Sequence, residues 1–205
     1  MNSIETLFEQ NPEPKSFADA YLRHLSAVLD RIDRAEIANL IQAFQTARAK
    51  KAKIFFIGNG GSAATASHFA NDLGVGTRSW DNPFRAIALT DNVAVLTALG
   101  NDHGYDKIFT LQLKTLMEPG DTVVAISASG NSPNVIDAVE YANSVGATTI
   151  GLTGFDGGNL RKLAKISVHA PTGPAEFGPV EDAHMILDHL CGAFLMNWVR
   201  TSRGR

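Results

Sequence analysis

Residues 54–73 read IFFIGNGGSAATASHFANDL, in which an apolar run passes through a glycine-rich turn into a segment of helical composition. The apolar run is typical of a strand buried on both faces of a parallel sheet. The glycines allow the turn to take positive φ and to approach a ligand closely. Backbone N–H groups at the start of a helix, together with the Ser62 hydroxyl, can surround an anion. The stretch therefore predicts a strand, an anion-binding loop and a helix.

A second stretch of the same construction lies at residues 122–133 and reads TVVAISASGNSP. Its apolar run opens into the hydroxyls of Ser127, Ser129 and Ser132, and Pro133 stands where a helix would begin. Two such loops at the carboxyl ends of different strands indicate a small phosphorylated ligand at a switch point of the sheet.

Short apolar runs alternate with helix-length segments on both sides of these two loops. The runs predict strands at 54–57, 84–89, 122–126, 148–152 and 166–169, and the segments between them predict helices at 62–73, 92–100, 105–117, 133–145 and 179–200. The first 50 residues carry two apolar stripes at helical spacing and predict two helices, the second capped by Asp33, for packing or subunit contact. This alternation predicts a mostly parallel sheet covered on both faces.

The chain shows no repeat or linker that would divide it. We therefore expect one domain over residues 1–205, with helices over 1–50, an α/β core over 53–200 and a frayed tail over 201–205.

The composition narrows the class of protein. The 205 residues are 44% hydrophobic and 19% charged, with a net charge of -3, which fits one globular domain. No apolar run approaches the roughly 20 residues of a membrane-spanning helix, and the polar, acidic N-terminus does not resemble a signal peptide. The single cysteine, Cys191, predicts a core residue in a reducing cytoplasm. Without a basic cluster longer than Lys50-Lys51, binding to a nucleic-acid backbone is disfavoured.

Other interpretations of the glycine-rich loops fit less well. Gly58, Gly60 and Ala63 match the GxGxxG/A dinucleotide pattern, but the acidic residue expected about 20 positions later is not well placed, since Asp91 lies about 30 positions on. Neither loop ends in the GK[ST] of a P-loop. A third interpretation, plain strand-to-helix turns, is less favoured because the construction occurs twice.

Acid, base and metal candidates occur on two predicted helices. His68 and Asp72 are four residues apart and so share one helix face. The last helix carries five further candidates, and periodicity alone does not choose among them: Glu181, Asp182, His184, Asp188 and His189. Histidine and carboxylate ligands suit zinc and several other divalent ions. The alternative is an ion pair at His68–Asp72 and an acidic first turn that complements the helix dipole.

Five motifs, in order and at similar spacing, resemble the phosphoheptose isomerase family of the sugar-isomerase (SIS) domain superfamily. They are GNGGSAATASHFANDL, Gly100-Asn101-Asp102, SASGNSPNV, LTGFDGG and VEDAHMILDHL. The resemblance implies a flavodoxin-like, three-layer α/β/α sandwich around a five-stranded sheet, and a homotetramer with active sites between subunits. It also implies an aldose–ketose isomerase that converts sedoheptulose 7-phosphate to D-glycero-D-manno-heptose 7-phosphate through an enediol.

The resemblance also assigns site residues by position. It implies sugar and phosphate contacts from two loops and one further segment: Asn59, Gly60, Gly61, Ser62, Asn101, Asp102, Ser127, Ala128, Ser129 and Ser132. It further implies one zinc ion held by His68, Asp72, Glu181 and His189, with Asp72 as base and His189 as acid.

Two of the zinc positions depart from the family pattern. Asp72 stands where the family has Glu, so its carboxylate is drawn back by roughly 1.5 Å. Glu181, counted among the residues near the substrate as well, stands where the family has Gln and makes the site more negative. We interpret these changes as a retuned metal site.

Two alternatives remain open. One is a non-catalytic sugar-phosphate-binding protein, like the family's replication-initiator-associating relative. The other is an isomerase of a different sugar phosphate, with residues 171–179 bordering the site and setting the choice.

Overall fold

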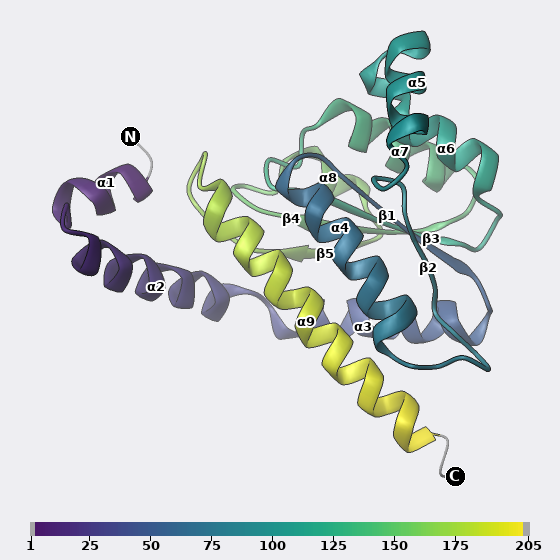
Figure 1. Ribbon diagram of the computed structural model, residues 1–205, viewed down its shortest axis with the longest axis horizontal. Helices are drawn as coiled ribbons and strands as arrows, with labels where there is room; N and C mark the ends of the chain where they lie inside the picture. The colour runs from purple at the N-terminus through teal and green to yellow at the C-terminus, as the bar shows by residue number, and fades with distance from the viewer. Residues whose placement is uncertain (1–2, 203–205) are drawn as a thin grey trace.

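The computed structural model describes residues 3–202, which build a five-stranded sheet between two layers of helices (Figure 1). The strands are β1 (Lys53–Gly58), β2 (Arg85–Ala88), β3 (Thr122–Ser127), β4 (Thr148–Thr153) and β5 (Ile166–His169). They lie in the order β2-β1-β3-β4-β5, and every neighbouring pair is parallel. This is the flavodoxin-like order, whose switch point lies between β1 and β3.

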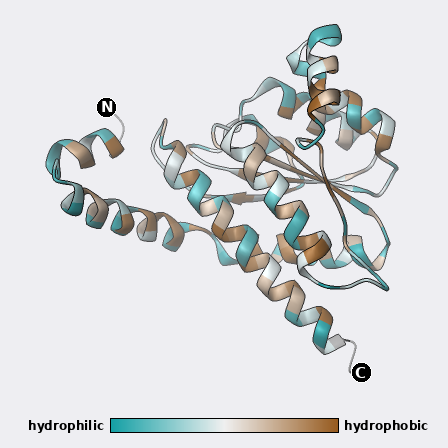
Figure 2. Ribbon diagram, in the orientation of Figure 1, coloured by the Kyte–Doolittle hydropathy of each residue, from teal (hydrophilic) through white to brown (hydrophobic). Residues whose placement is uncertain are grey.

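Alternate residues of each central strand enter two separate cores. Ile54 and Phe56 pack with α3 (Arg34–Ala49), α4 (Gly61–Asn71) and α9 (Phe177–Ser202) on one face. Phe55 and Ile57 pack with α6 (Ile108–Leu116), α7 (Pro133–Ser144) and α8 (Gly158–Leu163) on the other. Because both faces are covered, the central strands β1 and β3 are mostly apolar. Figure 2 shows hydrophobic residues along the central strands and an alternation of hydrophobic and hydrophilic residues along α9.

Three helices lie outside these two layers. Helices α1 (Ser3–Gln10) and α2 (Pro14–Arg31) form an arm that extends from the body beside the start of α9 (Figure 1). Helix α5 (Val93–His103) projects at the opposite end and buries none of its residues. A π-helical turn, Asp72–Gly76, continues α4, and a 3-10 turn, Tyr105–Lys107, precedes α6.

The predicted strands are all confirmed to within one residue at either end. The two helices predicted in the first 50 residues are confirmed as α2 and α3, the second capped by Asp33, but a further helix, α1, precedes them, and Phe8 on it packs edge-on against Phe17. Helix α8 was not predicted, since its opening glycines are typical of a loop. The predicted fraying fails for Thr201 and Ser202, which end α9, and residues 203–205 lie outside the described part.

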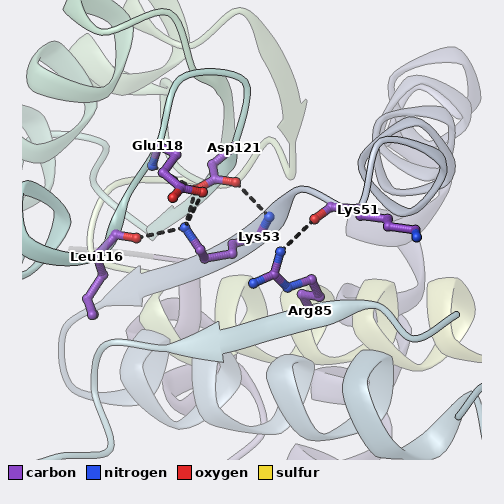
Figure 3. Close-up of polar contacts among 6 residues, drawn as sticks. All are labelled: Lys51, Lys53, Arg85, Leu116, Glu118 and Asp121. Carbon is purple, nitrogen blue, oxygen red and sulfur yellow. Dashed lines mark hydrogen bonds and ion pairs between the residues drawn. The ribbon is translucent and has the colours of Figure 1, made fainter. Parts of the chain in front are cut away.

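Polar contacts fix the amino ends of the strands, opposite the two loops (Figure 3). The Lys53 backbone N–H donates to Asp121 Oδ1 at 2.7 Å, and its ammonium donates to the Leu116 carbonyl and to the carboxylates of Glu118 and Asp121. Arg85 donates to the Lys51 carbonyl at 2.9 Å. These contacts align β1, β2 and β3 and so set the position of the loops at their other ends.

Among the described residues, no helix combines the length and the apolar character needed to span a membrane.

Candidate active site

The two loops lie next to each other at the carboxyl ends of β1 and β3, where the strand order reverses. Ligands in open α/β sheets bind at such a switch point. A pocket of about 230 Å³ occupies this place. Its walls are Asn59, Gly60, Gly61, Ser62, Ile126, Ser127, Ala128, Ser129, Ser132, Phe177 and Glu181. The structure thus brings together every predicted residue of the two loops, with Glu181 beside them.

Among the described residues, those that line the pocket include no Lys or Arg. An anion in the pocket would therefore be bound by backbone N–H groups and hydroxyls. Helices α4 and α7 begin at its walls, so the positive ends of two helix dipoles lie there. Ser127 Oγ and Ser132 Oγ lie 3.3 Å apart on one side of the pocket. These features suit a phosphate group.

The loop of residues 127–132, called the serine loop below, is held by the loop that follows β4 and by α8. The Gly154 N–H donates to the Ala128 carbonyl at 3.0 Å, and the Leu160 N–H donates to the Gly130 carbonyl at 2.9 Å. Gly130 has a φ of +63°, and a Cβ on it would lie 2.1 Å from the Gly157 carbonyl oxygen. Only glycine fits at this position.

A reciprocal pair of amides orients Asn59. Its Nδ2 donates to Asn134 Oδ1 at 2.8 Å, and Asn134 Nδ2 donates back at 2.9 Å. The Tyr105 hydroxyl donates to the same Asn59 oxygen at 2.9 Å. Asn134 is buried, and sequence reasoning missed its role although it lies in the SASGNSPNV motif.

A second cluster of functional side chains lies further along α4 and α9. One donor atom from each of His68, Asp72, Asp188 and His189 lies within 4.8 Å of the others. His68 Nε2 lies 3.2 Å from His189 Nε2, 3.5 Å from Asp72 Oδ2 and 3.8 Å from Asp188 Oδ2. Three of the four predicted metal ligands are therefore together, and Asp188 is with them.

Glu181 lies in the other group of residues, at the pocket. A Cβ built on Gly61 would lie 2.2 Å from Glu181 Oε2, so the Glu181 carboxylate occupies the space that the glycine leaves free. Burial raises the pKa of Glu181, and neighbouring Asp182 raises it further. The role of Glu181 as a zinc ligand stays a prediction.

Helices α4 and α9 run side by side in the same direction (Figure 1). Gly61 faces Glu181, His68 faces Asp188 and Asp72 faces Gly192, a constant offset of 120 positions. The pocket pair and the cluster pair are seven residues apart on each helix, which is about 10 Å along the axis. The pocket and the cluster thus lie at successive positions along one packed pair of helices.

The remaining candidates of α9 differ in their surroundings. Burial raises the pKa of Asp188 to about 7, with a further contribution from the Asp72 carboxylate. His184 is buried against the sheet, 3.3 Å from the Thr153 carbonyl, and burial lowers its pKa to about 4. Cys191 is buried, and burial raises its thiol pKa to about 12, which agrees with a core role.

Asn101 and Asp102 are exposed on α5 and are not among the lining residues of the pocket in this protomer. The Asn101 side-chain amide donates to Asp102 Oδ1 at 2.7 Å. Their predicted contact with the sugar stays a prediction.

Comparisons with known proteins agree with this architecture. The sequence model of the SIS domain matches residues 17–154. The chain belongs to the SIS-domain family. A phosphoheptose isomerase of Trichlorobacter lovleyi is 41% identical over 157 residues, which cover 76% of this chain and 77% of the relative. One from Aquifex aeolicus is 35% identical over 191 residues, which cover 93% of each.

Solved structures extend the comparison to three dimensions. The phosphoheptose isomerase of Neisseria gonorrhoeae superimposes with a TM-score of 0.79 at 30% identity, covering 89% of this chain and 98% of that one. Within the SIS family the chain therefore belongs to the phosphoheptose isomerases. The resemblance recognised in the five motifs and the three-layer fold that it implied are confirmed.

Proposed function

We propose that this SIS-domain protein is an aldose–ketose isomerase that converts sedoheptulose 7-phosphate to D-glycero-D-manno-heptose 7-phosphate through an enediol. The observation that carries the proposal is that the same helix pair, α4 and α9, holds a phosphate-type pocket and, about 10 Å further along, a histidine–aspartate cluster. The two relatives described above, which are 41% and 35% identical to this chain, are phosphoheptose isomerases.

The spacing between the pocket and the cluster is comparable to the length of a seven-carbon substrate. Each carbon–carbon bond of about 1.5 Å advances an extended chain by roughly 1.3 Å, so the carbonyl carbon lies roughly 9 Å from the phosphorus. Seven residues of helix span about 10 Å. We therefore propose that a phosphate held by the hydroxyls of Ser127, Ser129 and Ser132 places the reacting carbons near the cluster that contains Asp72 and His189.

The chemistry needs a base near a carbon-bound hydrogen and an acid near the carbonyl oxygen. In our proposal Asp72 takes a proton from carbon 1 while His189 gives one to the oxygen on carbon 2, which forms the enediol. Asp72 then returns its proton to carbon 2, and His189 accepts the proton of the oxygen on carbon 1. The Asn71 amide donates to Asp72 Oδ1 at 2.9 Å, which leaves Oδ2 facing the cluster.

The cluster also fits a divalent cation, and we propose zinc. Metal–nitrogen and metal–oxygen bonds of about 2.0–2.1 Å place tetrahedral ligands about 3.3 Å apart, close to the separations of 3.2 to 3.8 Å at His68 Nε2. His68, Asp72 and His189 would hold it; the family pattern implies Glu181 as the fourth ligand, but Glu181 lies at the pocket in this protomer. When bound, such an ion polarises the hydroxyl and carbonyl oxygens of the substrate.

Binding energy at the phosphate end positions the reacting carbons against Asp72.

The proposal includes a homotetramer, supported by exposed apolar side chains on α5 and α9, among them Val93, Leu190 and Phe194. It also includes a cytoplasmic location, which the unpaired thiol of Cys191 supports.

An NMR time course with sedoheptulose 7-phosphate, run with zinc and again after chelation, tests the proposal. We expect zinc-dependent appearance of the aldoheptose phosphate. The variants Asp72→Asn and His189→Ala should each lower turnover by about 100-fold or more while the protein stays folded. Unchanged turnover in both variants would remove the acid–base assignment.

Two other results would favour the alternatives. Binding of the sugar phosphate without conversion, by a protein that also retains a macromolecular partner, would favour a non-catalytic binding protein. Conversion of a pentose or hexose phosphate in preference to the heptose would favour an isomerase of another sugar, with Phe177 and Glu181 at the pocket as the residues to exchange.

A further inference from the structure

We infer that Asp188 is a ligand of the metal site, so that this chain holds its divalent cation with two histidines and two aspartates. The inference rests on the proposed metal site and deepens it, because the family pattern assigns no role to this position. The four residues are His68, Asp72, Asp188 and His189.

The first argument is the environment of the Asp188 carboxylate. The residue is fully buried, and neither of its oxygens accepts a hydrogen bond. A buried carboxylate without donors is unfavourable unless a cation completes its surroundings. His68 Nε2 lies 3.8 Å from Asp188 Oδ2, which is beyond hydrogen-bond distance. The carboxylate is therefore buried at the cluster without a hydrogen-bond donor.

The second argument is the direction of the neighbouring donors. His68 and His189 approach each other with their Nε2 atoms 3.2 Å apart, and their rings meet edge to face. Asp72 Oδ2 faces the same nitrogen of His68 at 3.5 Å. Four donor atoms from two helices thus converge on one small volume, as the ligands of a single ion do.

The third argument is charge. The carboxylates of Asp72 and Asp188 both face His68 Nε2, with one oxygen of each at 3.5 and 3.8 Å from it. A divalent cation placed among these groups balances the charge of two carboxylates.

The inference gives the two acidic residues of α9 separate tasks. Glu181 lies at the phosphate pocket against Gly61. Asp188 lies seven residues later on α9, with His68 at the cluster. In this arrangement Glu181 contacts the substrate, and Asp188 takes the fourth ligand position.

Equilibrium zinc binding to the purified full-length protein tests the inference without use of turnover. Metal is removed by chelation, and zinc is returned in competition with a chromophoric chelator. We expect one zinc per wild-type chain and a loss of affinity of at least about tenfold in Asp188→Asn. The matched control is Asp182→Asn, on the same helix outside the cluster, which should stay within about twofold of wild type.

A stability measurement covers the case in which the Asn variant folds poorly. Removing a buried unpaired carboxylate with Asp188→Leu should raise the melting temperature of the metal-free protein above that of wild type. Added zinc should then raise the melting temperature of wild type more than that of the variant. If Asp188 had only a structural role, added zinc would raise the melting temperatures of wild type and variant by the same amount.

The inference is overturned if Asp188→Asn binds zinc as tightly as Asp182→Asn, or if Glu181→Gln loses affinity while Asp188→Asn keeps it. It is also overturned if wild type binds none of zinc, cobalt(II) and manganese(II). Zinc binding that depends on Asp188 without conversion of the heptose phosphate would remove the proposed function and leave this inference standing.

Discussion

The amide pair of Asn59 and Asn134 shows how a buried residue outside the pocket wall sets the geometry of the wall. Asn134→Ala removes both reciprocal hydrogen bonds and leaves Asn59 held by Tyr105 alone. Losing about 1.4 kcal/mol of positioning corresponds to a tenfold weaker interaction, so we expect KM to rise about tenfold with a smaller change in kcat.

Steady-state kinetics measure this split. Asn143→Ala is the control, because Asn143 donates to the Leu163 carbonyl and accepts from Thr149 away from the pocket. It should lower stability and leave KM unchanged. An equal rise in KM for both variants would contradict the positioning role of Asn134.

Gly130 tests the packing of the serine loop. In Gly130→Ala the new Cβ meets the Gly157 carbonyl oxygen, and the residue keeps a positive φ, so we expect unfolding free energy to fall by about 2 to 4 kcal/mol and phosphate affinity to fall with it. Gly146→Ala separates the two causes, since Gly146 has a φ of +86° and open space around it. Chemical denaturation should show a loss of only about 1 to 2 kcal/mol for that control. Equal losses would mean that the contact with Gly157 is unimportant.

Residue types and spacing could predict both loops and the pair of His68 and Asp72, because each motif is local in sequence, and the resemblance to the family added His189. They could not distinguish Asp188 from Glu181 or His184. The three lie close to one face of a regular helix, and only the packing of α9 against α4 and the sheet separates them. His184 turns to the Thr153 carbonyl, Glu181 to Gly61 and Asp188 to His68.

At the scale of elements, the arm of α1 and α2 is tied to the segment that starts α9. His24 Nε2 lies 2.7 Å from Glu176 Oε2, Ser3 donates to the other carboxylate oxygen, and the Tyr21 hydroxyl donates to Asp182 at 2.6 Å. These contacts fix the start of α9, where Phe177 and Glu181 line the pocket. The arm therefore supports the site from outside the sandwich.

The contacts of Glu176 with the arm make the stability of the folded state depend on pH, and the pKa of Glu176 gives the direction. Burial by itself raises the pKa of Glu176, but hydrogen bonds from Ser3, His24 and the Gly173 N–H outweigh it and leave the pKa below the ordinary value of 4.5. A carboxyl with a lowered pKa stabilises the folded state above the unfolded pKa, and this stabilisation is lost as pH falls through the folded pKa. We expect denaturant unfolding from pH 7 down to pH 3 to show a loss below about pH 4.5.

Glu176→Gln should lose less stability over the same pH interval, because its side chain does not titrate. Glu13→Gln, an exposed acidic residue beside the start of α2, is the control and should follow wild type. Identical acid profiles for wild type and Glu176→Gln would contradict the tie.

At the scale of the whole molecule, apolar runs and turn residues could predict the sheet, because a parallel sheet covered on both faces demands apolar strands. The strand order could not be read from those runs. The short helices α1 and α8 could not be predicted from those runs either, since their stability comes from contacts such as that of Phe8 with Phe17. The predicted division into helices over 1–50 and a core over 53–200 stays a prediction.

The proposed tetramer is a prediction at this scale. Ile186, Leu190 and Phe194 recur every four residues on the outer side of α9 and are 37%, 42% and 48% exposed. Light scattering after gel filtration should give about four times the chain mass of 21.9 kDa. Leu190→Lys should lower that mass, whereas Leu116→Lys, on an exposed site of α6 at the other face, should leave it unchanged. A monomer mass for wild type would contradict the assembly.

The measurement that tests the central claim most directly is NMR of sedoheptulose 7-phosphate with the zinc-loaded protein in deuterium oxide. The account predicts an aldoheptose 7-phosphate that carries deuterium at carbon 2, because a base that exchanges with solvent moves the proton through an enediol. Asp72→Asn should abolish both conversion and exchange. Substrate that binds, shown by line broadening, but neither exchanges nor converts would contradict the claim that the pocket and the cluster along α4 and α9 form an isomerase site.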